Sequence, residues 1–299
     1  MQFVTVLLPI FFIFAVGFVG EKVLHINTKS ITTMTVYLMT PLLSFSVFYE
    51  TTFNMDYLMM AIYALALVFC IIGIIYIVAM LRGYDVKKTC GMILSSAFMN
   101  NGNYGTPLIL FAFGEPALHY AVILMVIQQL IMATIGVYFA AKGSQDNEGA
   151  NDTWKKVLKV PIMYGALLGV IFHFLNIPLS PTMLDAIKMV GDAAIPTVML
   201  VLGMTLAKIS VKKIQVKPLS FALTLRLVVS PLIAWGMTLV LPVDDMLKQV
   251  MIVLAAMPSA ANTTMYALQY GTEPDFVSTA TLFSTLASIV TLPIVLFMV

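Results

Sequence analysis

The sequence predicts an all-α polytopic membrane protein. Of its 299 residues, 61% are hydrophobic and only 10% are charged, whereas soluble domains carry roughly 25% charged residues. The apolar residues form stretches long enough to cross a bilayer, which takes about 20 residues in a helix. Short polar connections separate these stretches. The net charge of +2 is too small to indicate a nucleic-acid partner. The apolar stretches instead predict that the lipid bilayer surrounds the protein.

Ten stretches are expected to span the membrane. They are residues 3–22, 31–49, 57–81, 90–113, 118–141, 158–176, 183–207, 218–241, 246–270 and 275–298. The longest connection is the polar linker 142–157, which divides the chain into a first five-helix repeat (1–141) and a second (158–299). An odd number of spans in each half forces the second half to enter the membrane upside down. Weak identities between the halves, such as Pro41 with Pro196 and Met99 with Met257, favour an inverted duplication.

The basic residues predict the orientation in the membrane. Most of the 16 lysines and arginines fall in the loops after spans 1, 3, 5 and 7, while the loops after spans 2, 4 and 8 lean acidic. Basic loops favour the cytoplasmic side. We therefore expect a multi-pass protein of the cell inner (cytoplasmic) membrane with both termini on the non-cytoplasmic side.

Two spans contain polar interruptions. Span 4 holds residues 100–107 (NNGNYGTP), and span 9 holds residues 258–264 (PSAANTT). Exposed backbone in hydrocarbon costs several kcal/mol per group, so such breaks survive only where protein encloses them or where they line a cavity. Gly102 and Gly105 permit close backbone approach, and Pro107 and Pro258 each remove a backbone donor. Broken helices in corresponding positions of two halves indicate the binding site of a transporter.

The two breaks also predict the ligand class. A half-helix N-terminus at the bilayer centre carries roughly half a positive charge and favours anions. Where the two breaks cross, their ends would enclose a small polar pocket. The alternative is that these side chains only cap helices or join them, and for Ser259 packing is the favoured role. The candidate substrate-binding residues are Asn100, Asn101, Asn103, Asn262, Thr263 and Ser259.

Two charged residues, Arg226 and Asp192, are expected to lie well inside the membrane, where ionisable groups are functional suspects. Arg226 could pair with a carboxylate substrate or hold the site electropositive. It could equally reach the interface with its long stem or pair with backbone carbonyls. Asp192 could be a protonation site or a partner for Arg226, or it could pair with Lys188 one turn earlier.

At these residues the chain resembles the auxin efflux carrier family, which includes plant PIN-type auxin carriers and bacterial relatives linked to malonate or malate. The resemblance rests on Asn100-x-Gly102-x-x-Gly105-x-Pro107, on residues 257–263 (MPSAANT) and on residues 226–231 (RLVVSP). It implies a ten-helix fold with spans 4 and 9 broken and crossed, like bile-acid symporters and some sodium/proton antiporters. It also implies an elevator movement of a transport domain (spans 3–5 and 8–10) against a scaffold (spans 1, 2, 6 and 7). Asn103 departs from the family, because an apolar residue is expected there, and the short central loop differs from the long loops of plant carriers.

The leading hypothesis is a secondary transporter that moves a small organic anion, a carboxylate, by alternating access. The alternatives are a cation/proton antiporter or a sodium-coupled symporter of the same fold. An enzyme is not expected, because the chain shows no nucleophile–base pair, paired aspartates or HExxH motif. A sensor would usually carry a soluble output domain. We expect no cofactor and no metal site; the coupling ion, H⁺ or Na⁺, the direction of transport and the oligomeric state, including a homodimer, are left open.

Overall fold

The computed structural model describes residues 2–51, 55–144, 161–209 and 214–299. Within these ranges the chain is helical, as predicted, and contains no β-strand; an isolated antiparallel β-bridge joins Met99 and Ser259. The predicted linker 142–157 lies outside the described residues from position 145 onward.

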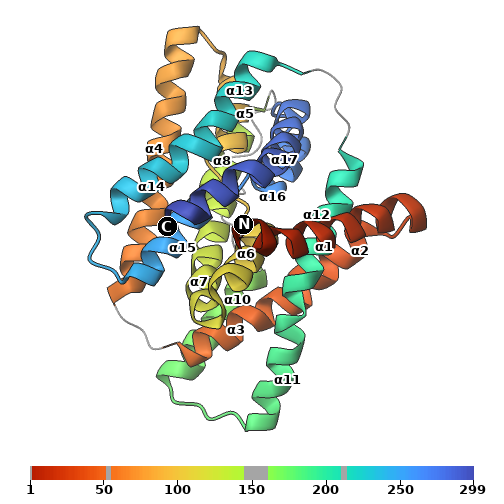
Figure 1. Cartoon of the computed structure of the whole chain (residues 1–299), viewed down its shortest axis with the longest axis vertical. Coiled ribbons are helices and arrows are strands. Elements are labelled where there is room, and N and C mark those ends of the chain that lie inside the picture. Colours follow the sequence, from red (N-terminus) through yellow and green to blue (C-terminus); the bar gives the residue numbers. More distant parts are fainter. Residues whose placement is uncertain (1, 52–54, 145–160, 210–213) are drawn as a thin grey trace. The chain divides into compact units, whose positions relative to one another are not determined.

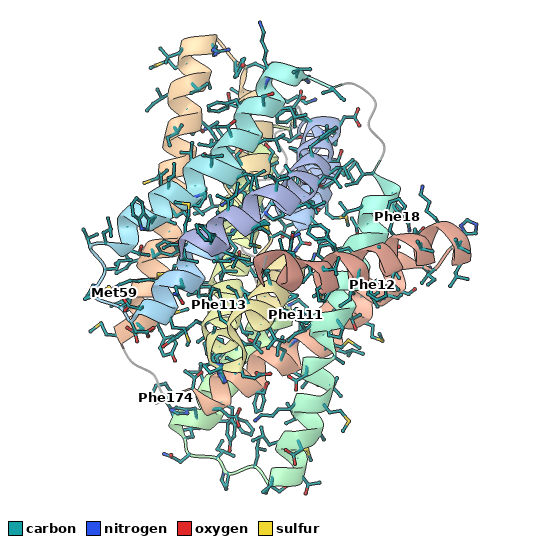
Figure 2. The ribbon with its side chains drawn as sticks, in the orientation of Figure 1. Phe12, Phe18, Met59, Phe111, Phe113 and Phe174 are labelled. Atoms are coloured by element: carbon teal, nitrogen blue, oxygen red, sulfur yellow. The ribbon has the colours of Figure 1, made fainter. Side chains whose placement is uncertain are left out.

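Seven helices of the described chain are long and apolar enough to cross a membrane. They run over Leu7–Leu24, Thr28–Glu50, Met55–Arg82, Glu115–Lys142, Pro181–Lys208, Val216–Thr238 and Pro274–Met298. Predicted spans 4 and 9 are each interrupted, and predicted span 6 is described only from Pro161 to Phe174. Large apolar side chains face outward, among them Phe12 and Phe174, which are 67% and 61% exposed (Figure 2). Such exposure suits a lipid environment.

The chain folds into two compact units, and their helices are labelled in Figure 1. Unit 1 comprises Met1–Leu58, Gly102–Ile127 and Lys159–Lys208. In it α1 packs along α12, and α3 packs against α10 and α11. Its helices are α1 (Gln2–Leu24), α2 (Thr28–Met34), η1 (Thr35–Met39), α3 (Thr40–Glu50), α6 (Thr106–Phe113), most of α7 (Glu115–Ile131), α10 (Pro161–Phe174), α11 (Pro181–Asp192) and α12 (Ala194–Lys208).

Glycines let the helices of unit 1 approach closely. A Cβ added to Gly17 of α1 would lie 2.2 Å from the carbonyl oxygen of Leu200, and one added to Gly203 of α12 would lie 2.0 Å from that of Phe14. In a membrane, where burial from water does not drive helices together, such small residues allow backbones to pack in van der Waals contact. Because these two positions carry no side chain, the backbones of α1 and α12 can lie in direct contact.

Unit 2 comprises Met59–Asn101, Gln128–Leu158 and Ile209–Val299. Unit 2 holds the second interruption and the chain of the first interruption as far as Asn101. Within it, α17 packs against α5, α13 and α16. Its helices are most of α4 (Met55–Arg82), α5 (Val86–Ser96), η3 (Met132–Gly136), α8 (Val137–Lys142), α13 (Val216–Thr224), η5 (Leu225–Val229), α14 (Ser230–Thr238), α15 (Asp245–Ala255), α16 (Ala261–Tyr270) and α17 (Pro274–Met298). The π-helical turn η2 (Asn101–Gly105) leads from unit 2 into unit 1.

Three π-helical turns precede a proline. Turns η1, η2 and η5 are followed by Pro41, Pro107 and Pro231, each in the first turn of the next α-helix. A proline has no N–H, and its ring collides with the carbonyl group four residues earlier. Widening the preceding turn accommodates the ring, and π-turns of this kind often mark functional positions. Turn η5 carries Arg226.

Candidate functional site

The two interruptions of unit 2 are joined through their main chains. α5 ends at Ser96 and α15 ends at Ala255. Beyond them, the Asn100 N–H donates to the carbonyl oxygen of Pro258 at 2.9 Å, and the Ala260 N–H donates to that of Phe98 at 3.0 Å. Unpaired backbone groups cost several kcal/mol each in hydrocarbon. Each break therefore satisfies the backbone of the other, in a buried crossing.

The breaks begin earlier than the polar sequences suggest. The first covers residues 97–100, whereas Asn101, Gly102, Asn103 and Gly105 belong to the π-helical turn η2. Pro107 stands in the first turn of α6, so it widens the turn before it rather than forming the break. The second break covers residues 256–260 and contains Pro258. The glycines of η2 therefore lie in helical rather than open backbone.

Hydroxyl groups secure the crossing. The Ser259 Oγ donates to the carbonyl oxygen of Ser95, and its N–H donates to Ser284 Oγ at 3.1 Å. Ser259 is 1% exposed. Thr263, fully buried, donates from Oγ1 to the carbonyl oxygen of Ala260 at 2.7 Å. Both hydroxyl groups donate their protons inside the protein. This favours a packing role for Ser259, whereas the hydroxyl oxygen of Thr263 can still accept a hydrogen bond.

The N-terminus of α16 offers donors for an anion. Its N-cap residue, Ala260, provides no side-chain cap. Asn262 lies in the first turn and is half-buried, and within the described residues its amide makes no hydrogen bond. Free N–H groups at a helix N-terminus attract negative charge. This end of α16 therefore presents donors of the kind that an anion accepts from.

Two buried amides lie in the same unit. Asn101 is 4% exposed and Gln128, on α7, is 2% exposed. In the part of the chain that the structure describes, the Asn101 Oδ1 and both polar atoms of the Gln128 amide lack hydrogen-bond partners. Leaving such a group unpaired costs about 1–3 kcal/mol, and exceptions of this kind point to function. The turn η3, which follows Gln128 on the same helical segment, packs against α16.

Gln128 was not expected from the sequence. It sits within predicted span 5 as half of the pair Gln128-Gln129. A buried polar residue in an apolar span was the signal that could have revealed it.

The other predicted asparagines have different surroundings. Asn100 is 4% exposed and its backbone takes part in the crossing. Asn103 is half-buried in the part of η2 that belongs to unit 1. The structure thus brings Asn100, Asn101, Ser259, Asn262 and Thr263 into unit 2, and places Asn103 in unit 1.

Arg226 is fully buried beneath the crossing, on turn η5. Its Nη1 donates to the carbonyl oxygen of Ser96 at 3.1 Å, and its Nη2 donates to Ser230 Oγ and to the carbonyl oxygen of Ala255. Of the roles expected for Arg226, the structure shows the pairing with backbone carbonyls. The acceptor residues Ser96 and Ala255 are the last residues of α5 and α15.

Asp192 lies elsewhere, at the exposed C-terminal end of α11 in unit 1. Lys188 does not pair with it, but instead binds Glu50 at 2.7 Å.

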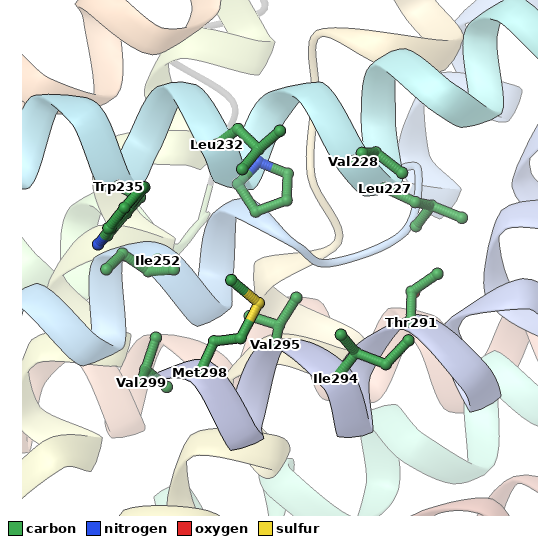
Figure 3. Close-up of a pocket in the computed structure, with 11 residues that line it drawn as sticks. Leu227, Val228, Leu232, Trp235, Ile252, Thr291, Ile294, Val295, Met298 and Val299 are labelled. Atoms are coloured by element: carbon green, nitrogen blue, oxygen red, sulfur yellow. The ribbon is translucent and has the colours of Figure 1, made fainter.

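An apolar pocket of about 330 Å³ lies between α14, α15 and α17 (Figure 3). Its wall includes Trp235, Leu232 and Ile294, each about half exposed. None of the polar residues of the crossing lines it. The pocket is therefore unsuited to a small anion.

A helical membrane protein whose two interrupted helices cross at polar breaks has the architecture of a membrane transporter. Sequence comparison agrees. Residues 2–296 match a family model described as "Membrane transport protein", and the chain belongs to this family, which includes the auxin efflux carriers. It is a transporter and not an enzyme.

Several relatives carry transporter names. An "Uncharacterized transporter" of Methanothermobacter thermautotrophicus is 31% identical over 223 residues, 74% of this chain and 72% of the relative. A Rhizobium meliloti protein named "Putative malonate transporter" is 24% identical over 304 residues, 98% of this chain and 94% of the relative. The Arabidopsis thaliana "Auxin efflux carrier component 1" is 28% identical over 149 residues, 48% of this chain but only 23% of the relative.

Proposed function

We propose that this protein is a secondary transporter that carries a small organic anion, a carboxylate, across the cytoplasmic membrane by alternating access. The observation that carries the proposal is the uncapped N-terminus of α16 beside the half-buried amide of Asn262. Backbone N–H groups and an amide NH₂ are donors that a carboxylate accepts from, and the helix end adds a favourable partial charge.

A dicarboxylate the size of malonate is the first substrate to test. The name of the Rhizobium relative assigns malonate to that protein. A second carboxylate needs further donors, and the amide of Gln128 is buried without a partner among the described residues. A substrate that fills this role would remove the cost of the unpaired amide.

The transport cycle we propose uses ten spans in two inverted repeats. The two half-helices before the breaks support this symmetry: α5 and α15 each have 11 residues, and each begins with an aspartate N-cap. Asp85 accepts from the Lys88 N–H at 2.7 Å, and Asp244 accepts from the Leu247 N–H at 2.8 Å. Inverted repeats provide two related states that open to opposite sides.

We also propose an elevator movement of spans 3–5 and 8–10 against spans 1, 2, 6 and 7. The division of the chain into two compact units agrees with this grouping for seven spans: spans 1, 2 and 7 lie in unit 1, and spans 3, 8, 9 and 10 lie almost wholly in unit 2. Spans 4 and 5 are divided between the two units. The basic loops favour both termini on the non-cytoplasmic side.

Proton coupling is the coupling we propose, with Asp192 as its titratable group. Lys188 is engaged by Glu50, and the Asp192 carboxylate is exposed. In Asp192→Asn, uptake should no longer respond to external pH. An unchanged pH response would discard Asp192 from this role.

The experiment that tests the anion site is a thermal-shift screen of purified protein against mono- and dicarboxylates, followed by uptake into vesicles. Asn262→Ala should weaken binding at least tenfold while the unliganded protein unfolds at the wild-type temperature. Gln269→Ala is the matched control, because Gln269 is an exposed amide on the same helix. If no carboxylate shifts the wild-type protein, or if both variants bind alike, the proposal is wrong.

A further inference from the structure

We propose that Arg226 is a built-in cation that balances the C-terminal ends of α5 and α15, so that the anion site operates without a bound metal ion at the crossing. This inference rests on the proposed transport of an anion. Arg226 is then a positioning residue, because it acts through the two helices and not by contact with the substrate.

Charges of opposite sign balance at the crossing. Each helix C-terminus carries roughly half a negative charge, and its last carbonyl groups lack intrahelical partners. Two such ends meet here, and together they approach one negative charge. A single guanidinium donates to the last residue of both helices, Ser96 and Ala255. One fixed positive charge therefore offsets both ends.

The geometry suits arginine in particular. The guanidinium presents its donors in a rigid planar fork, which lets separate nitrogen atoms reach separate acceptors. Nη1 serves α5, and Nη2 serves α15. Ser230 Oγ accepts from Nη2 and itself donates to the carbonyl oxygen of Ala255 at 3.0 Å, which fixes the orientation of the fork.

Among the described residues, no acidic side chain forms an ion pair with Arg226. The ion pairs found among the described residues are Lys188–Glu50, Lys208–Glu21 and Lys248–Asp245, and none includes Arg226. A buried charge needs compensation by partners. Carbonyl groups at the two helix ends supply it, so the arginine and the helix ends each require the other.

The guanidinium nitrogens of Arg226 occupy the place where transporters with broken helices bind a metal cation. In such proteins half-helix C-termini and unwound carbonyl groups coordinate Na⁺. Here the carbonyl groups of Ser96 and Ala255 are taken by Arg226, and that of Ser95 is taken by the Ser259 hydroxyl. With the negative ends neutralised, the N-terminus of α16 can act on an anion without opposition.

Thermal unfolding without substrate tests the structural part of this inference. Three variants separate charge from hydrogen bonding: Arg226→Lys keeps the charge, Arg226→Gln keeps donors only, and Arg226→Met keeps neither. The unfolding temperature should fall in that order, with Lys the mildest. Free guanidinium at millimolar concentration should partly restore Arg226→Met. Arg82→Met is the matched control, since Arg82 is exposed at the end of α4, and it should be neutral.

Ion dependence tests the functional part. Wild-type binding of malonate, and its uptake, should be equal in sodium, potassium and choline salts. Binding to Arg226→Gln should be at least tenfold weaker and should improve with added guanidinium. A wild-type affinity that rises severalfold with sodium would overturn the inference. So would variants that lose malonate binding while they unfold like the wild type without ligand, because Arg226 would then contact the anion itself.

The two proposals fail differently. If no carboxylate binds the wild type, the proposed function is wrong, but the unfolding order of the Arg226 variants still decides the role of the arginine. If Arg226→Met unfolds at the wild-type temperature, the built-in cation is wrong even where malonate is transported.

Discussion

The side-chain hydroxyl of Ser259 donates a hydrogen bond to the carbonyl oxygen of Ser95, which ties the second interruption to the last turn of α5. Because Ser259 is 1% exposed, bulk water does not reach this bond. Ser259→Ala should therefore destabilise the protein by about 1–3 kcal/mol through the unpaired carbonyl group.

The same substitution should leave substrate affinity unchanged in the fraction that stays folded, because the hydroxyl faces the crossing. Chemical denaturation in detergent and calorimetric titration of the folded protein measure the two quantities. Ser278→Ala, on an exposed part of α17, serves as the control. A large loss of affinity with unchanged stability would place Ser259 in the anion site instead.

Gln128→Met should stabilise the protein and impair transport. The substitution conserves volume and removes two buried polar atoms that have no partners among the described residues, so the unliganded protein should gain about 1–3 kcal/mol. Malonate uptake should fall at least tenfold if this amide serves the substrate. The neighbouring Gln129→Met is the control, since Gln129 is only half-buried. A destabilised Gln128→Met protein would mean that the amide has a structural partner.

Gly203→Ala should prevent accumulation of folded protein. The added Cβ would meet the carbonyl oxygen of Phe14 at 2.0 Å, and neither helix backbone can yield without loss of the α1–α12 contact. Gly73→Ala on α4 meets nothing within 4 Å and should be neutral or stabilising by up to about 1 kcal/mol. Fluorescence-detected size-exclusion chromatography compares the two; equal monodisperse peaks would contradict the close packing.

A reporter at the C-terminal end should report the orientation. Alkaline phosphatase fused after Val299 should be active in a bacterial host, because the basic loops favour a non-cytoplasmic C-terminus. Green fluorescent protein at the same position should stay dark. Bright fluorescence with inactive phosphatase would reverse the predicted topology.

The sequence predicted the helical class and both interruptions, because these follow from composition and from amide, glycine and proline residues. It misplaced the interruptions by several residues. Residues 97–99 are apolar and give no local sign of a break. The carbonyl oxygen of Phe98 accepts from the Ala260 N–H, and the N–H of the next break residue, Asn100, donates to Pro258. These partners lie about 160 positions away in the chain, so only the tertiary structure can mark the break.

The candidate site, too, could be predicted only in part from the sequence. Asn262 was predicted as an amide in the polar interruption of span 9, and it lies at an uncapped helix end. The role of Arg226 could not be chosen from the sequence, since a substrate, a lipid interface and backbone carbonyls all suit a guanidinium. Its partners Ser96 and Ala255 become visible only when both half-helices end at one point.

Main-chain hydrogen bonds join Asn100 to Pro258 and Phe98 to Ala260, and they also constrain how the two breaks can change in evolution. If a substitution turned one broken segment into a continuous helix, backbone donors and acceptors of the other segment would lose their hydrogen-bond partners. Straightening one break alone would thus destabilise the other, so the two breaks are expected to be kept or lost together.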